Sequence, residues 1–236
     1  MKVHKKTIKY QGVYIVIPAY NEEVTLREVI RGVSRYIPRN QIILVNDGSS
    51  DATNQIGCEE DVIVIRHKLN RGQGAALATG IKASLQLGAR AVVTFDADNQ
   101  HNPDDIPIIL EPVLSGKVDV VLGSRFLNDG SRIPRFRRTA LKIGVWVTRV
   151  FSRMKVTDIH NGFRALNTSA AKRIQLRQDN MVHASEFLDE IRKNNLSYVE
   201  CPVRISYSTY SQKKGQKNHH AFKLALRIFL YKVLFS

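Results

Sequence analysis

The sequence has little cysteine and no long hydrophobic run. Its two cysteines, Cys58 and Cys201, lie far apart and form neither a metal-binding nor a redox motif. No stretch of about 18 apolar residues occurs, so no membrane-spanning helix is predicted. Residues 1–9 are basic and lack the apolar core of a secretion signal. We therefore expect a protein of the reducing cytosol, and 236 residues are enough for one large domain.

Acidic residues are scarce in the second half of the chain. Residues 1–124 hold equal numbers of basic and acidic side chains, so the whole net charge of +15 lies in residues 125–236. This asymmetry indicates an anionic partner for the second half, such as nucleic acid, an anionic membrane surface or a phosphorylated acceptor. The net charge is the only feature that supports a nucleic-acid partner, since neither an RNA-binding motif nor a helix-turn-helix pattern is present. We therefore expect no nucleic-acid partner.

Apolar strands alternate with amphipathic helices in the first half. The strands are expected at residues 13–17 (stopped by Pro18), 42–45, 62–65, 91–95 and 118–122, and the helices at 22–36, after the turn 46–51, at 74–87 and at 102–114. This alternation predicts an α/β fold with a mostly parallel sheet covered on both faces. Ligands of such sheets bind beyond the carboxyl ends of the strands.

The second half has a different pattern. Helices are expected at residues 139–156, 182–194 and 219–236, with a strand at 198–206 and loops at 128–138 and 207–218. The helix at 139–156 could face either a membrane surface or the protein core, whereas 219–236 favours a membrane or a membrane partner. We expect one domain over residues 1–215 and a C-terminal amphipathic helix over 216–236.

Two carboxylates, Asp96 and Asp98, follow the fourth expected strand. Side chains at positions i and i+2 of an extended segment point the same way. Two converging carboxylates repel each other unless a cation lies between them, and oxygen ligands of this kind suit Mg²⁺ or Mn²⁺. For this motif alone, the alternative is a plain turn, because Asp and Asn are also favourable turn residues.

Five motifs at strand ends follow one another in order. They are residues 17–22 (Ile-Pro-Ala-Tyr-Asn-Glu), 45–51 (Val-Asn-Asp-Gly-Ser-Ser-Asp), 70–76 (Asn-Arg-Gly-Gln-Gly-Ala-Ala), 95–101 (Phe-Asp-Ala-Asp-Asn-Gln-His) and 123–125 (Gly-Ser-Arg). The ordered set resembles glycosyltransferase family 2 with the GT-A fold. Within that family it resembles the polyprenyl-phosphate sugar transferases related to dolichyl-phosphate mannosyltransferase. The resemblance covers roughly residues 12–210.

The resemblance implies a nucleotide-sugar donor site in the first half. Asp47 would hydrogen-bond the base or the ribose, and the same pocket would be lined by Pro18, Tyr20, Glu22, Asp96, Ala97 and Asp98. Mg²⁺ or Mn²⁺ would be bound by Asp96, Asp98 and Gln100, and would neutralise charge on the leaving diphosphate. We expect the glycines of residues 70–76 to allow a tight turn and close packing rather than to cradle phosphate.

The resemblance also implies an acceptor site on the basic side. Arg125 could clamp a phosphate, and Arg137 and Arg138 resemble a second phosphate-binding cluster. Residues 158–165 resemble the family's Asp-x-x-x-Gly-Phe-Arg segment, which adds Asp158 and Arg164. The implied catalytic residues are Asp98, Arg125, Asp158 and Glu186. A phosphate acceptor is already anionic and needs no base, so Asp158 and Glu186 are acceptor-site candidates only.

The basic loop at residues 207–218 departs from the dolichyl-phosphate mannosyltransferase pattern. Gln212 stands where the family has an arginine, and Lys213 and Lys214 are expected to supply the positive charge instead. The loop is more similar to prokaryotic members, some of which work with a small membrane-protein partner. His160, His183, His219 and His220 are expected to be surface or packing residues rather than ligands.

The predicted function is therefore inverting transfer of a monosaccharide from a nucleotide-sugar to a membrane polyprenyl phosphate. The expected location is the cytoplasmic face of a membrane, on an anionic surface, with a small integral-membrane protein as a possible partner. The alternative is an enzyme of the same fold that extends a cell-envelope saccharide or a glycolipid.

Overall fold

A seven-stranded sheet with helices on both faces forms the centre of the protein. The computed structural model describes residues 10–127, 154–177 and 183–206. Its strands are β1 (Val13–Ala19), β2 (Ile42–Asn46), β3 (Ile63–Arg66), β4 (Ala91–Thr94), β5 (Val120–Ser124), β6 (Arg164–Asn167) and β7 (Tyr198–Pro202). Its helices are α1 (Leu26–Val33), α2 (Thr53–Glu59), α3 (Gln73–Gln86), α4 (Ile106–Leu114), α6 (Thr168–Arg173) and α7 (His183–Lys193), with 3₁₀ turns at Arg39–Gln41 and Pro103–Asp105.

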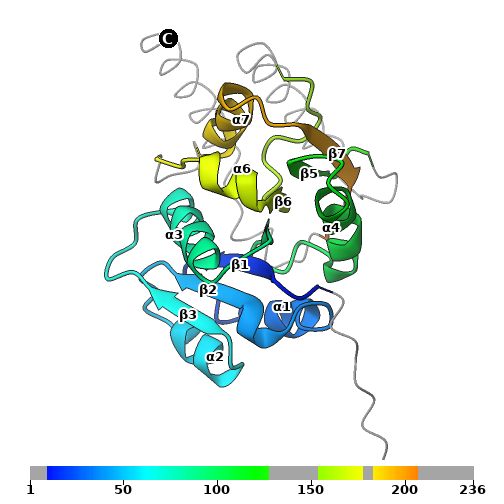
Figure 1. Ribbon diagram of the computed structural model, residues 1–236. Coiled ribbons are helices and arrows are strands. Elements are labelled where there is room, and N and C mark those ends of the chain that lie inside the picture. The colour runs from blue at the N-terminus through cyan, green and yellow to red at the C-terminus, as the bar shows by residue number, and fades with distance from the viewer. Residues whose placement is uncertain (1–9, 128–153, 178–182, 207–236) are drawn as a thin grey trace, which may run out of the picture.

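The sheet is mostly parallel, as the sequence predicts. Its strand order is β3-β2-β1-β4-β6-β5-β7 (Figure 1). Only β6 runs against its neighbours, with Arg164 opposite both Thr94 of β4 and Leu122 of β5. The first residue of β6 therefore lies at the same edge as the last residues of the parallel strands.

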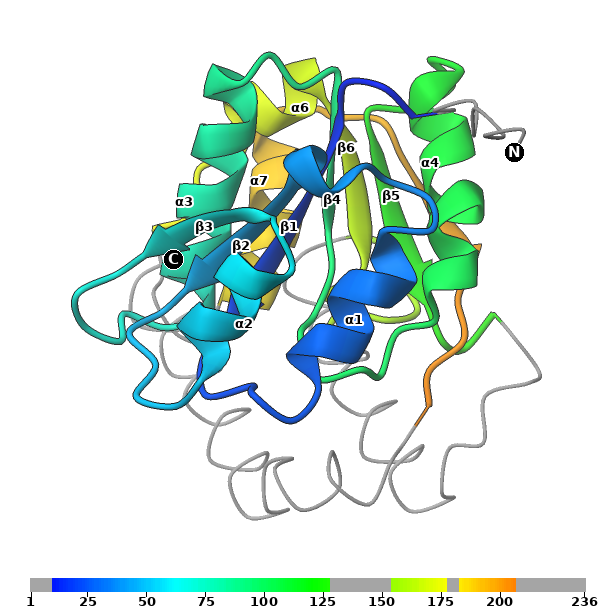
Figure 2. The ribbon, with the colours of Figure 1, turned by 90° about the horizontal axis from the view of Figure 1, so that it is seen from below.

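Alternate residues of the central strands pack into two separate apolar cores. Ile15 and Ile17 of β1 face the core formed with α1, α2 and α4, whereas Val16 faces the core formed with α3, α6 and α7. This alternation is the two-residue period of an extended chain buried on both faces. Figures 1 and 2 show α1 and α3 on opposite faces of β1. The two cores fix the sheet, and so fix the edge at which its strands end.

Two expected boundaries in the first half are wrong. Strand β1 continues through Pro18 to Ala19, because its ladder with β4 has ended at Val16 and Pro18 is paired on the β2 side. The first helix begins at Leu26 instead of residue 22. The backbone amides of Asn21 and Glu22 donate to the hydroxyls of Ser49 and Thr53, which hold residues 21–25 in a turn.

Differences in the second half are larger. The strand expected at residues 198–206 ends at Pro202, and Ile205 forms only an isolated bridge with His101. The helix expected at 139–156 does not include Met154, Lys155 or Val156, and the rest of it lies outside the described residues. Strand β6 and helix α6 were not predicted. The boundary expected between residues 215 and 216 also lies outside the described residues.

Candidate active site at the carboxyl edge of the sheet

Side chains from four strands gather at one edge of the sheet. Asp47 follows β2, Asp96 follows β4 and Arg125 follows β5, while Arg164 opens the antiparallel β6. The carboxyl edge is where parallel sheets bind ligands. The structure therefore places candidates from both the donor half and the acceptor half of the sequence along one edge.

Asp96 is held on three sides by other segments. Its Oδ1 accepts a hydrogen bond from Nε2 of Gln73, the first residue of α3, at 3.0 Å. Its Oδ2 lies 2.9 Å from Nε2 of the buried His101. A methyl group on Gly162 would lie 2.5 Å from both carboxylate oxygens, so that glycine is required for the close approach. Burial acts to raise the pKa of Asp96, but the hydrogen bond with His101 and nearby positive charges outweigh it and lower that pKa.

Asp98 lies in a turn after the strand. Residues 97 and 98 form the turn, Asn99 adopts a left-handed conformation (φ 59°), and the amide of Gln100 donates to Asp98 Oδ1 at 3.1 Å. Burial and the negative charge of Asp96 raise the pKa of Asp98 to about 6. The turn and the two neighbouring carboxylates are thus both present, and the charge of Asp96 is a second cause, after burial, of the raised pKa of Asp98.

The donor set at this edge fits a divalent cation bound together with phosphate. Among the described residues, no three His, Cys, Asp or Glu side chains are arranged to hold a metal ion by themselves. Mg²⁺ is usually bound by one or two carboxylates together with waters and substrate phosphates, and does not need a cage made only of protein. Asp96 and Asp98 provide such a pair, whose repulsion a cation would relieve. Gln100 is tied at its backbone, with its carbonyl accepting from the amide of Ser206 at 2.9 Å.

Asp47 is enclosed by its own chain. Its side chain is 4% exposed, and its Oδ1 lies 2.6 Å from Nδ1 of His67. The amides of Arg71 and Gly72 donate to the same carboxylate at distances from 2.6 to 3.2 Å. Gly72 has a φ of 97°, a backbone conformation that favours glycine, and its amide lies close to the Asp47 carboxylate. In this conformation the Asp47 carboxylate anchors residues 67–72.

The other donor-site candidates lie at the end of β1. Pro18 is buried in the strand, whereas the side chain of Tyr20 is exposed. Thr25 links two motifs, because its hydroxyl donates to the carbonyl of Ala97 at 2.8 Å and lies 3.3 Å from Oε2 of Glu22. Glu22 and the Asp96–Asp98 turn therefore share a neighbour.

Arg125 and Asp158 form a buried ion pair. Arg125 Nε donates to Asp158 Oδ2 at 2.6 Å, and the Arg125 amide donates to the same oxygen at 3.1 Å. Their side chains are 9% and 1% exposed. Asn161 Nδ2 adds a third hydrogen bond to that oxygen at 3.3 Å. Asp158 thus fixes the direction of the Arg125 side chain.

Arg164 carries a buried positive charge that interacts with the charges of Asp96 and Asp158. Its guanidinium donates to the carbonyls of Asn161 and Ile159, each at 3.0 Å, and lies 4.3 Å from the ring centroid of Phe187. Burial lowers its pKa to about 10, partly offset by the charges of Asp96 and Asp158, so it is protonated at neutral pH. The charge therefore adds positive potential at the edge where the anionic groups of a ligand would lie.

Glu186 is near the start of α7. Its Oε1 accepts from the backbone amide of Arg177 at 2.9 Å, which ties α7 to the segment after α6. The remaining acceptor candidates, Arg137, Arg138, Lys213 and Lys214, lie outside the described residues. The same is true of His219 and His220.

Sequence reasoning missed two residues that hold Asp96, namely Gln73 and His101. His101 packs against the rings of Phe95 and Phe163, and its Nδ1 is buried without a hydrogen-bond partner. Both residues stand inside motifs that the sequence singled out, and this was the available signal. His183, expected to be a packing or surface residue, is buried.

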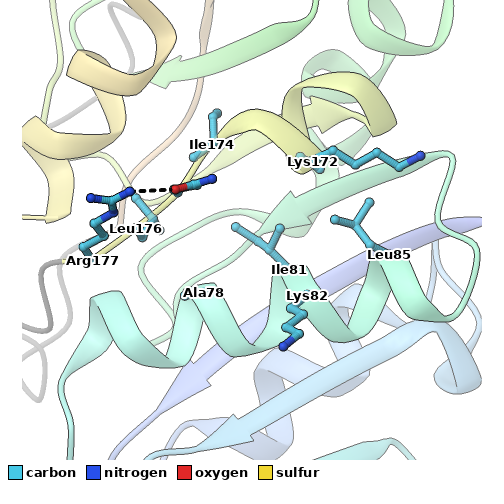
Figure 3. Close-up of a pocket in the computed structure, with 10 residues that line it drawn as sticks. Ala78, Ile81, Lys82, Leu85, Lys172, Ile174, Leu176 and Arg177 are labelled. Atoms are coloured by element: carbon cyan, nitrogen blue, oxygen red, sulfur yellow. Dashed lines mark hydrogen bonds between the residues drawn. The ribbon is translucent and has the colours of Figure 1, made fainter. Parts of the chain in front are cut away.

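One cavity of about 390 Å³ lies between α3 and the end of α6 (Figure 3). Its walls are apolar, from Ile81, Leu85 and Ile174, with Lys82 and Arg177 also lining it. None of the predicted site residues lines this cavity. The candidate site is therefore defined by the chemistry at the sheet edge and not by this hollow.

No helix in the described part of the chain combines the length and apolar character needed to cross a bilayer.

Comparison with known proteins identifies relatives across nearly the whole chain. A UDP-N-acetylglucosamine–dolichyl-phosphate N-acetylglucosaminyltransferase of Methanococcus voltae is 35% identical, over 94% of this chain and 96% of the relative. A polyprenol monophosphomannose synthase of Mycolicibacterium smegmatis is 29% identical, over 83% and 78%.

Solved structures share the fold. Glucosyl-3-phosphoglycerate synthase of Mycobacterium tuberculosis, in complex with Mn²⁺, UDP-glucose and glycerol 3-phosphate, matches with a TM-score of 0.67. The match is 18% identical and covers 94% of this chain and 78% of the other. The family model described as Glycosyl transferase family 2 matches residues 14–175. The chain therefore belongs to glycosyltransferase family 2.

Proposed function

We propose that the protein transfers a monosaccharide, with inversion, from a nucleotide-sugar to a polyprenyl phosphate, and that the reaction depends on Mg²⁺ or Mn²⁺. The similarity to the Methanococcus voltae enzyme over nearly the full length of both chains supports this substrate class. The similarity to polyprenol monophosphomannose synthase supports the same kind of acceptor with a different sugar. UDP-N-acetylglucosamine is accordingly the first donor to test.

The observation that carries the proposal is the position of Asp98 beside Asp96 just after β4, with the Asp96 carboxylate held by Gln73 and His101. Two neighbouring carboxylates at a sheet edge repel each other, and burial together with the negative charge of Asp96 raises the pKa of Asp98 to about 6. A site of this kind is stabilised when a cation binds. A divalent cation bound by Asp96 and Asp98, with Gln100 as a further ligand, would neutralise charge on the leaving diphosphate.

The chain's own residues would orient the two anionic substrates. Pro18, Tyr20, Glu22, Asp47 and Ala97 are proposed to form the nucleotide pocket. Of these, Asp47 would have to exchange contacts with the amides of residues 71 and 72 for contacts with the nucleoside.

Arg125 and Arg164 are proposed to attract phosphate groups, since both place a positive charge at the same edge. The acceptor's phosphate oxygen would form a bond to the anomeric carbon as the bond from that carbon to the diphosphate oxygen breaks. No proton is transferred, because the acceptor oxygen is already anionic near neutral pH. A general base is therefore not needed, and the Asp158 carboxylate already accepts a hydrogen bond from Arg125. Asp158 and Glu186 are proposed to hold the acceptor side of the site in place.

The location is proposed to be the cytoplasmic face of a membrane. The net charge of +15 in residues 125–236 would attract an anionic surface, and residues 216–236 would lie on that surface or contact a small integral-membrane partner. Arg137, Arg138, Lys213 and Lys214 would face the phosphate of the lipid acceptor.

A transfer assay tests the proposal. Purified protein is incubated with Mn²⁺, membranes that contain polyprenyl phosphate, and a panel of labelled UDP- and GDP-sugars. We expect label from one donor in the organic phase, and loss of that label on chelation. Label that appears only in a water-soluble saccharide would instead support the alternative, an enzyme that extends a saccharide.

A further inference from the structure

Glu200 of β7 binds a turn that belongs to a distant part of the chain. Its Oε1 accepts three hydrogen bonds, from the amide of Thr157 at 2.8 Å, the hydroxyl of Thr157 at 2.9 Å and the amide of Asp158 at 3.1 Å. A carboxylate that accepts several N–H and O–H bonds forms stronger interactions than a neutral acceptor does. One half-buried side chain therefore fixes both the backbone and the side chain of this turn.

The turn Thr157–Asp158, which Glu200 holds, also contacts Ser124 and Arg125. Thr157 Oγ1 lies 2.6 Å from Ser124 Oγ, and Asp158 Oδ2 accepts from Nε and from the amide of Arg125. Strand pairing adds to this, because Glu200 lies opposite Leu122 of β5, a short distance along the strand before Ser124 and Arg125. The contacts thus run without a break from Glu200 through the turn to the guanidinium of Arg125.

We propose that Glu200 is a positioning residue that sets the orientation of Arg125 by holding the turn Thr157–Asp158. Glu200 acts as a hydrogen-bond acceptor and touches no reacting atom. The proposal takes from the proposed function only the role of Arg125 as the arginine that binds a phosphate of the substrates. Because Nε is used by Asp158, the donors on the two Nη atoms are the ones whose direction is set.

Asp119 offers a matched control at the other end of the same two strands. It directly precedes β5, and its Oδ2 accepts from the amide and the hydroxyl of Ser197, which directly precedes β7, at 2.9 and 2.7 Å. The Asp119 carboxylate therefore links the start of β5 to the start of β7, whereas the Glu200 carboxylate links β7 to the turn Thr157–Asp158. Only Glu200 is at the edge that carries Arg125.

The first experiment does not depend on activity. In ¹⁵N-labelled full-length protein, exchange of the Arg125 Nε proton with solvent is followed by NMR, with the resonance assigned from Arg125→Lys. We expect Glu200→Ala to accelerate this exchange at least about tenfold, whereas Glu200→Gln, which keeps an Oε1 acceptor, and Asp119→Ala leave it within about twofold of wild type. Unchanged exchange in Glu200→Ala, or equal acceleration in Asp119→Ala, would overturn the proposal.

The second experiment measures transfer. Glu200→Ala is expected to lower kcat/KM at least about tenfold with donor KM unchanged, and Glu200→Gln is expected to restore it. In the Arg125→Lys background, Glu200→Ala should cause less than about a twofold further loss, since it acts through Arg125. Additive losses, or no rescue by Gln, would contradict the role. If wild-type protein transfers no sugar, the proposed function fails, and the exchange measurement still decides the role of Glu200.

Discussion

Burial and the charge of Asp96 disfavour the charged form of Asp98, which is central to the proposed chemistry. We expect Asp98→Asn to reduce transfer by at least about 10²-fold, because the variant loses a cation ligand next to the leaving group. The fold should be retained and the Tm should not fall, since the substitution removes repulsion with Asp96. Activity assays, Mn²⁺ binding and thermal unfolding check this.

Asp61→Asn is a suitable control, because Asp61 is exposed and has a positive φ that asparagine accepts well. This control should behave as wild type. Unimpaired turnover by Asp98→Asn would remove the assignment of Asp98 as a metal ligand.

Gly162 provides a second prediction at the scale of one residue. In Gly162→Ala the new methyl group would meet both oxygens of Asp96 at 2.5 Å and force the carboxylate to move. We expect at least about a tenfold loss of kcat, larger than the loss of stability would explain. Gly88→Ala is the comparison, because it strains a backbone with φ of 80° but meets no atom within 4 Å.

The Gly88 variant should lose about 1 kcal/mol of stability and retain its activity. Equal activity losses in the two variants would show that Gly162 matters for folding alone.

The sequence was informative about which residues lie at the carboxyl edge of the sheet. The positions of Asp96, Asp98 and Arg125 could be anticipated because each follows a short apolar run at the edge where parallel sheets bind ligands. The contacts that hold these side chains could not be anticipated from the sequence. Gln73 is 23 residues from Asp96, and Glu200 is 43 residues from Thr157, so only the packed fold brings these pairs together.

At the scale of elements, ion pairs around the buried Glu60 join α1, the Arg39–Gln41 turn and the end of α2. The side chain of Glu60 is 3% exposed and contacts Arg27 and Arg31 at 2.9 Å and Arg39 at 2.7 Å. Burial acts to raise the pKa of Glu60, but hydrogen bonds with the three arginines outweigh it and lower the pKa to about 2. The charged form of Glu60 is therefore favoured in the folded protein.

We expect Glu60→Gln to reduce the free energy of unfolding by about 2 kcal/mol at pH 7. Because the folded pKa lies below the unfolded value, this contribution is fully present above about pH 4.5 and is lost as the pH falls towards 2. Urea unfolding at pH 7 and pH 3 measures the difference, which should shrink at pH 3. The neighbouring Glu59→Gln affects an exposed pair and should change stability little. A difference that is independent of pH would contradict the account.

The elements that the sequence predicted are those with long apolar periodicity. The five expected strands and the helices around them occur with boundaries shifted by a few residues. The sequence pattern did not predict strand β6, because the strand is four residues long, opens with a buried arginine and inserts antiparallel between β4 and β5. Its place is set by pairing with those strands, and local propensity did not indicate it.

At the scale of the whole molecule, the net positive charge lies entirely in the second half of the sequence. We expect the full chain to sediment with vesicles that contain anionic phospholipid and to be released as the salt concentration rises, because the excess of +15 lies in residues 125–236. Vesicles of purely zwitterionic lipid are the control. Equal binding to both, without dependence on salt, would show that charge does not direct the protein to membranes.

The most direct test of the central claim compares two acceptors for one donor. Labelled UDP-N-acetylglucosamine, or whichever sugar the donor panel selects, is supplied with Mn²⁺ to equal amounts of polyprenyl phosphate and of a soluble saccharide. Wild type and Asp98→Asn are assayed side by side. We expect wild type to incorporate label into the lipid phosphate, chelation to abolish this incorporation, and the variant to incorporate little. Label in the saccharide alone, or equal incorporation by the variant, would contradict this expectation.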